Sequence, residues 1–238
     1  MATVPTSPNP DAGLRAQRLL EAMHPVCSHD LPNQAVALQS LLQLFAWDEA
    51  DQLSPQGREY FERLQSIAAK TTVFVRFLKE LARLQRLTPH PEKLPAGQIM
   101  HEVRTEAERM FPAQTWTWKC DWHEEPVTVD RRLVHHGLLH LLRSVVLGGG
   151  GAAATVEMQT TPHPDHVAWT IAFRRADPVA PPAPAAEAIQ LEQRLALTLA
   201  QEYLAATDIA CRAVEASTAG VTSFALMIPA LVQGALHG

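Results

Sequence analysis

The segment Ser28-His29-Asp30-Leu31-Pro32-Asn33 holds the residues best suited to chemistry in this chain of 238 residues. His29 and Asn33 are four positions apart, so in a helix they project from nearly the same side. An exposed neutral imidazole nitrogen is a good nucleophile toward phosphorus. The adjacent Asp30 can hydrogen-bond the other ring nitrogen and take up its proton, and Asn33 can orient the incoming group or a hydrolytic water. The alternative is a solvated helix face with an ordinary surface histidine, and the motif alone does not exclude it.

Two long helices must position this motif. From about residue 14 to residue 47 apolar residues recur at helical spacing and form a seam for a partner helix, made of Leu31, Ala35, Leu38, Leu42 and Phe45. Ser54 and Pro55 predict the start of a second helix that runs to about Leu87. Its apolar stripe consists of Leu64, Ile67, Thr71, Phe74, Leu78, Leu81 and Gln85. Such a hairpin leaves an apolar face uncovered unless a second copy packs against it, so we expect a homodimeric four-helix bundle.

Pro32 lies inside the first of these helices. A proline has no backbone N–H, so it frees the carbonyl four residues earlier, which is that of Ser28. We therefore expect the helix to bend beside His29.

The chain as a whole predicts an α+β fold in three parts. Residues 1–12 are expected to be disordered, residues 13–88 to form the helical hairpin, and residues 95–238 to form an α/β sandwich of helices on one sheet. The prolines of Thr88-Pro89-His90-Pro91 mark the boundary. The patterns beyond it predict helices over 96–110, 131–147 and 186–206, a Pro/Ala-rich loop over 177–184, and strands over 115–122, 127–129, 153–159, 166–174, 209–215 and 222–228.

Composition argues against several classes of protein. The formal net charge is −5 and no basic stripe is present, which argues against nucleic-acid binding. No export signal and no run of eighteen apolar residues occur, so a cytoplasmic protein without a membrane span is expected. The three cysteines are widely separated and are expected to be free thiols. His136 and His140 have the spacing of two metal ligands but lack an acidic third ligand, so no metal site is expected.

The segment Ser28 to Gln34 resembles the phosphoacceptor box of histidine kinases. In that family, His-Asp or His-Glu is followed three residues beyond the acid by Asn or Thr. Three further segments are similar to the family's ATP-binding domain in the same order: a strand and helix over 127–145, the helix after the ATP lid over 194–206, and the closing hairpin over 219–229. The resemblance spans about residues 14–229 and implies a dimeric phosphoacceptor hairpin followed by an ATPase-like domain.

The departures from the family concern the nucleotide. His140 and Ser144 stand where the family has two asparagines, and residues 173–178 contain no glycine where the family has Asp-x-Gly-x-Gly. The Pro/Ala-rich loop replaces the glycine-rich lid. A histidine and a proline-rich loop are poor replacements for a magnesium ligand and for phosphate-binding N–H groups. The resemblance thus implies a degenerate ATPase-like domain with no bound cofactor, similar to that of ChpT-type histidine phosphotransferases; Mg²⁺ would come from the partner receiver domain.

The leading hypothesis is a homodimeric histidine phosphotransferase that relays a phosphoryl group between receiver-domain aspartates of response regulators. His29 would be the phosphoacceptor, Asp30 its acid/base partner and Asn33 an orienting residue. The expected partners are receiver domains, with a hybrid kinase as a further candidate. Two alternatives stay open: a non-catalytic pseudokinase dimer that sequesters a response regulator or kinase, and a divergent active histidine kinase.

Overall fold

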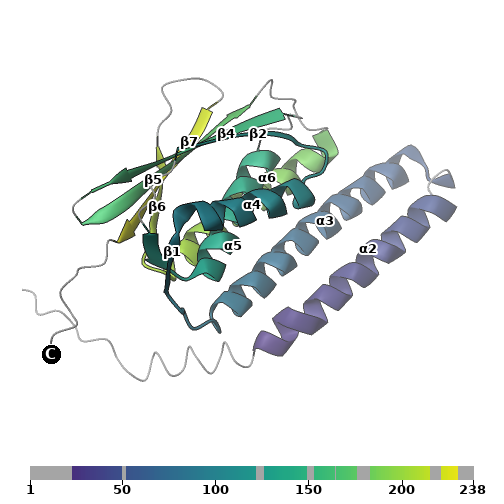
Figure 1. Ribbon diagram of the computed structural model, residues 1–238. Helices are drawn as coiled ribbons and strands as arrows, with labels where there is room; N and C mark the ends of the chain where they lie inside the picture. Colours follow the sequence, from purple (N-terminus) through teal and green to yellow (C-terminus); the bar gives the residue numbers. More distant parts are fainter. Residues whose placement is uncertain are drawn as a thin grey trace, which may run out of the picture. The chain divides into compact units, whose positions relative to one another are not determined.

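The computed structural model of the protein (Figure 1) describes residues 23–49, 52–121, 126–148, 153–163, 165–175, 183–214 and 221–229. The chain divides into two compact units, Met1–Arg86 and Leu87–Gly238. The predicted disordered segment 1–12 lies outside the described residues, as do most of the Pro/Ala-rich loop and glycines 149–151. None of the helices in the described part of the chain combines the length and the apolar character needed to cross a membrane.

The first unit is a helical hairpin. A π-helical turn, η1 (Val26–Asp30), leads into α2 (Leu31–Asp48), and α3 (Pro55–Leu84) returns alongside it. The predicted start of the second helix is confirmed, because the Ser54 side chain accepts a hydrogen bond from the Gly57 N–H at 3.1 Å. The buried residues of the two helices are Ala35 on α2 and, on α3, Phe61, Ala68, Thr72, Val75 and Leu84. The rings of Phe45 and Phe61 meet at 5.1 Å between centroids.

A second apolar row of the hairpin is exposed beside this packing, and Phe45, whose ring also meets that of Phe61, stands at its border. Leu64 is 54% exposed and Ile67 is 58% exposed on α3, and α2 contributes the exposed Leu38, Leu41 and Phe45. The apolar stripe predicted for α3 is therefore exposed at Leu64, Ile67 and Phe74. A residue outside that stripe, Phe61, makes the ring contact with α2. We call Leu38, Leu41, Phe45, Leu64, Ile67 and Phe74 the apolar hairpin face.

The second unit is a five-stranded sheet with helices on one face, which confirms the predicted α+β class (Figure 1). The strand order is β2 (Thr115–Asp121), β4 (Ala153–Pro162), β5 (His166–Arg175), β7 (Val221–Pro229) and β6 (Ala210–Val214). The pair β2–β4 is parallel and the other pairs are antiparallel. The covering helices are α4 (Ala96–Met110), α5 (Arg131–Leu147) and α6 (Ala183–Ala205). Alternate residues of β5 enter the core, with Trp169, Ile171 and Phe173 fully buried.

A small second sheet was not predicted from the sequence. Strand β1 (Glu92–Pro95) pairs antiparallel with β3 (Pro126–Val129), with Leu94 opposite Val127. The prolines of this region predicted only a break in the chain. They are compatible with a two-stranded sheet because Pro95 and Pro126 stand at its end, where a missing N–H is tolerated.

Asp130 caps α5 as predicted and also binds the segment around His90, at the start of the second unit. The carboxylate, which is 2% exposed, accepts hydrogen bonds from the N–H groups of Arg132 at 2.9 Å and Leu133 at 3.1 Å. It accepts a third from the N–H of His90 at 2.7 Å, forty residues earlier. One side chain thus satisfies the start of a helix and fixes the segment before β1.

The predicted half-buried face of β2 is only partly confirmed. Trp116 and Trp118 are half-buried and their rings stack at 5.4 Å, but Cys120 on the same face is exposed. Trp122 lies outside the described residues. Strand β2 is at the edge of the sheet.

Candidate functional site

The segment around His29 is a π turn rather than a regular α-helix. The N–H of Leu31 bonds the carbonyl of Val26, five residues earlier, and the turn ends two residues before Pro32. A proline ring clashes with the carbonyl four residues before it, here that of Ser28, and a wider turn relieves this clash. The disturbance predicted from Pro32 is thus a π turn that contains His29.

The three residues of the predicted site lie at the surface. The side chains of His29, Asp30 and Asn33 are all exposed. Within the described part of the chain, no hydrogen bond joins His29 to Asp30 or to Asn33. Neighbouring residues in a helical turn diverge, so the Asp30 carboxylate is close in sequence to the imidazole but does not hold it in this state. An exposed imidazole is open to attack an incoming group.

His29 stands at one end of an exposed stripe on α2. Steps of four and three lead from His29 to Asn33, Val36, Ser40, Leu44 and Trp47, which we call the His29 face. Val36 is 61% exposed and Trp47 is 88% exposed. The stripe carries no charged side chain along about 27 Å of helix, at 1.5 Å per residue. Of this face, only His29 and Asn33 were predicted to take part in chemistry.

A three-residue network beside His29 was not predicted. Ser28 Oγ lies 3.2 Å from Nε2 of His24, and Nη1 of Arg86 lies 3.0 Å from the same nitrogen. Arg86 follows the last turn of α3 and is 62 residues away in sequence. The only sequence signal was the hairpin itself, because its second helix must return to the start of the first.

In the second unit, α6 covers the face of α5 that carries His140 and Ser144. The ring of fully buried Tyr203 stacks on His140, with centroids 5.5 Å apart, and lies equally close to His136. Ser144 is buried and donates a hydrogen bond to the Leu141 carbonyl at 2.7 Å. Further along, Arg143 of α5 pairs with Glu192 of α6. Tyr203 of α6 therefore fills the space beside His140, and Gln193 of α6 lies close to Gly148, one turn beyond Ser144.

Helices α5 and α6 approach closely at Gly137. A Cβ atom added there would lie 2.8 Å from Cγ of Leu204, closer than non-bonded carbon atoms normally come. Glycine is required at this position by the contact between the helices.

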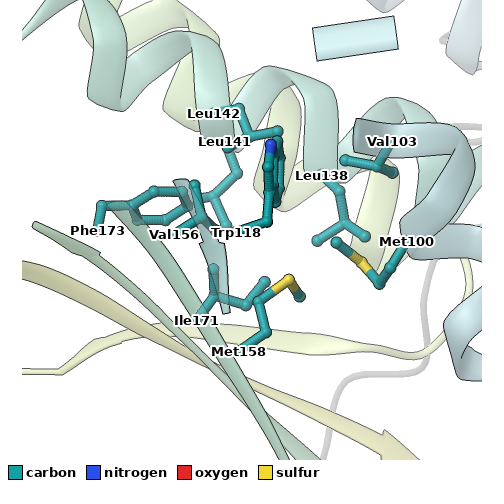
Figure 2. A pocket seen from close by; sticks show the side chains of 10 residues that line it. All are labelled: Met100, Val103, Trp118, Leu138, Leu141, Leu142, Val156, Met158, Ile171 and Phe173. Carbon is teal, nitrogen blue, oxygen red and sulfur yellow. The ribbon is translucent and has the colours of Figure 1, made fainter. Parts of the chain in front are cut away.

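Two cavities lined by described residues of the second unit are narrow. One has a volume of about 10 Å³ and is lined only by apolar side chains and the Trp118 indole. Figure 2 shows these side chains, from α4, α5 and the sheet, converging on one space. A second cavity, also about 10 Å³, lies beside Gln114 and Trp116. Each has room for about one water molecule.

Other reactive side chains form no site in the described residues. The rings of His135 and His136 meet edge to face at 5.7 Å, and no group of three His, Cys, Asp or Glu residues in the described ranges is arranged to hold a metal ion. The three cysteines are free thiols. Burial raises the pKa of the Cys211 thiol to about 11, so it stays protonated near neutral pH.

Comparison with known proteins gives matches in structure only. No protein-family model and no curated protein sequence matches this chain. Among solved structures, the histidine kinase AdeS of Acinetobacter baumannii has a TM-score of 0.51 at 12% identity, covering 85% of this chain and 98% of that chain. The histidine kinase ThkA, solved in complex with the response regulator TrrA, has a TM-score of 0.53 at 12% identity over 95% of this chain and 68% of that chain.

Full-length ShkA, solved with AMPPNP, has a TM-score of 0.51 at 16% identity, covering 90% of this chain and 46% of that chain. At such low identities the likeness concerns the fold alone. The helical hairpin and the helix-covered sheet together form a histidine kinase-like core.

Proposed function

We propose that this protein is a histidine phosphotransferase that relays a phosphoryl group between receiver-domain aspartates through His29. The observation that carries the proposal is the placement of His29. It is an exposed imidazole in a π turn at the start of a helical hairpin, within a histidine kinase-like fold. π turns are rare in proteins, and those that occur are often found at functional sites.

The proposed transfer is a displacement at phosphorus. A neutral ring nitrogen of His29 attacks the phosphorus of an aspartyl phosphate, so that a P–N bond forms and the P–O bond to the acyl oxygen breaks. The receiver's aspartate leaves as a carboxylate. The proton on the other ring nitrogen is hydrogen-bonded and taken up by Asp30 once its side chain rotates toward the ring. The second receiver reverses these steps, with its carboxylate attacking and the P–N bond breaking.

A partner's aspartyl phosphate is a better donor for this protein than ATP. The residues at the family's two asparagine positions are His140, on which Tyr203 of α6 stacks, and Ser144, which is buried and bonds the Leu141 carbonyl. Phosphate recognition needs free N–H donors and a magnesium site needs hard oxygen ligands. We therefore propose that the second unit binds no nucleotide and that the receiver domain supplies Mg²⁺ with its phosphoryl group.

The His29 face is the proposed receiver-docking surface. Phosphoryl transfer requires the donor aspartate to reach His29, so the receiver must cover the surface next to it. Val36, Leu44 and Trp47 offer exposed apolar contacts along the same side of α2. Exposed tryptophans are rare on monomer surfaces and are strong anchors in interfaces. The solved ThkA complex contains a response regulator, which supports a partner of this class.

The apolar hairpin face is the proposed dimer interface. Its six residues come from both helices, and none of them belongs to the His29 face. A second copy can therefore cover it and complete a four-helix bundle while His29 stays open.

The experiment is a transfer assay with receiver domains from the same genome, each charged at its aspartate with radiolabelled acetyl phosphate. The proposal expects acid-labile, base-stable phosphate on the wild-type protein and none on His29→Ala. A stable complex without label favours a sequestering scaffold instead. Label that arises from ATP in the absence of any receiver favours a divergent kinase.

A further inference from the structure

We infer that Arg86 is a positioning residue for His29, acting through His24 and Ser28. The inference rests on the proposed phosphoryl chemistry of His29. The three side chains connect the end of α3 to the turn that carries the acceptor, and the contacts Arg86 to His24 and His24 to Ser28 meet at one imidazole nitrogen.

Both partners of His24 lie against its ring. Nη1 of Arg86 lies 3.0 Å from Nε2 and 3.4 Å from Nδ1, so the guanidinium, which carries only donors, stands over the imidazole beside both nitrogens. The Ser28 hydroxyl lies 3.2 Å from Nε2. Arg86 therefore holds the His24 ring at the position where it also meets Ser28.

The network fixes the geometry of a turn that is otherwise easily changed. His24 precedes η1, Ser28 lies inside it, and His29 is the next residue. A change from π to α hydrogen bonding rotates every residue of the turn about the helix axis. His24 and Ser28 are linked to Arg86 at the end of α3. The direction in which His29 projects therefore depends on the position of α3. Misplacing a reacting group by about 1 Å can cost up to about 10²-fold in rate.

Loss of Arg86 should slow the chemical step at His29 without weakening receiver docking. Arg86 follows the end of α3 and belongs to neither the His29 face nor the apolar hairpin face. Arg86→Ala is expected to reduce the maximal transfer rate about tenfold with an unchanged half-saturating receiver concentration. Arg86→Lys keeps a donor and is expected to recover part of the rate. Arg83→Ala, which removes an exposed arginine one turn earlier, is the matched control.

A small phosphoryl donor separates this inference from the relay itself. Phosphoramidate transfers its phosphoryl group to a histidine nitrogen. A P–N bond to the imidazole forms, the P–N bond to the amine breaks, and the amine leaves as ammonia. Labelling of His29 in the full chain by phosphoramidate should also slow about tenfold in Arg86→Ala and in His24→Ala, and no further in the double variant. If phosphoramidate labels His29 but no receiver donates, the relay fails and this inference stands.

Two outcomes would overturn the inference. One is equal labelling rates in wild type and Arg86→Ala, and the other is an equal loss of rate in Arg83→Ala.

Discussion

The imidazole of His140 lies against the phenol ring of Tyr203, with centroids 5.5 Å apart and ring planes inclined by 22°. Tyr203 is fully buried between α5 and α6. Tyr203→Ala removes this ring from the contact between the helices and should lower the free energy of unfolding by about 3 to 5 kcal/mol, as measured by urea denaturation. Tyr203→Phe keeps the ring and should cost about 1 kcal/mol. Similar losses in the two variants would contradict the packing role of the ring.

The contact at Gly137 predicts opposite effects for two glycine-to-alanine changes. Gly137→Ala places a methyl group 2.8 Å from Cγ of Leu204 and should destabilise the protein by about 1 to 3 kcal/mol. Gly97, on α4, has no atom within 4 Å of the added Cβ. Gly97→Ala should therefore stabilise by up to about 1 kcal/mol through helix propensity. Thermal unfolding of both variants checks the contrast, and a stabilising Gly137→Ala would show that the helices do not approach this closely.

Asp130 predicts a loss of stability in acid. Burial alone raises the pKa of this carboxyl, but hydrogen bonds from the N–H groups of His90 and Leu133 and the nearby Arg132 guanidinium outweigh it, so the pKa lies below its ordinary value. A depressed folded-state pKa stabilises the protein above the unfolded value of about 3.9 and ceases to do so as the pH falls through the folded value. The stabilities of wild type and Asp130→Asn in urea should therefore begin to converge below about pH 4, and should converge fully once the pH is below the folded-state pKa.

At neutral pH, Asp130→Ala should cost about 2 kcal/mol, because it removes a helix cap and the partner of the His90 N–H. Glu108→Ala is the control, because that carboxylate is exposed and pairs with Arg104 on the surface of α4. It should change stability by less than about 0.5 kcal/mol. An equal effect of the two substitutions would contradict the role of the cap.

The apolar hairpin face predicts a self-association that one charge can break. Leu64→Glu or Ile67→Glu places a carboxylate in the proposed interface and should turn a dimer into a monomer in analytical ultracentrifugation. Gln65→Glu adds the same charge at an exposed position on another side of α3 and should leave the dimer intact. A wild-type monomer at micromolar concentration, or dissociation by Gln65→Glu alone, would contradict the assignment.

The His29 face predicts a separation of docking from chemistry. Trp47→Ala, some 18 positions beyond His29, should weaken receiver binding by about tenfold or more in calorimetry, because a large exposed anchor is lost. His29→Gln should abolish transfer with nearly unchanged binding. Gln34→Ala alters an exposed residue of α2 outside this face and should change neither. Receiver binding that is insensitive to Trp47→Ala would place the docking surface elsewhere.

The sequence alone determined features that depend on local chemistry. The cap at Ser54, the cap at Asp130, the helix Ala96–Met110 and the alternation of Trp169, Ile171 and Phe173 were all predicted, because capping and periodicity act between near neighbours. The α+β class followed from the order of these elements. The site residues His29, Asp30 and Asn33 came from one local motif, and their roles remain predictions.

Only the tertiary structure decided features that join distant segments. The pairing of β1 with β3, the bond from His90 to Asp130 and the contact of Arg86 with His24 each depend on how the chain returns to itself. The burial of Tyr203 against α5 likewise depends on two helices far apart in sequence. Even at Pro32, the sequence predicted a disturbance but not its form. Whether a helix kinks or opens into a π turn depends on the contacts that its neighbours make, and these are set by the folded hairpin.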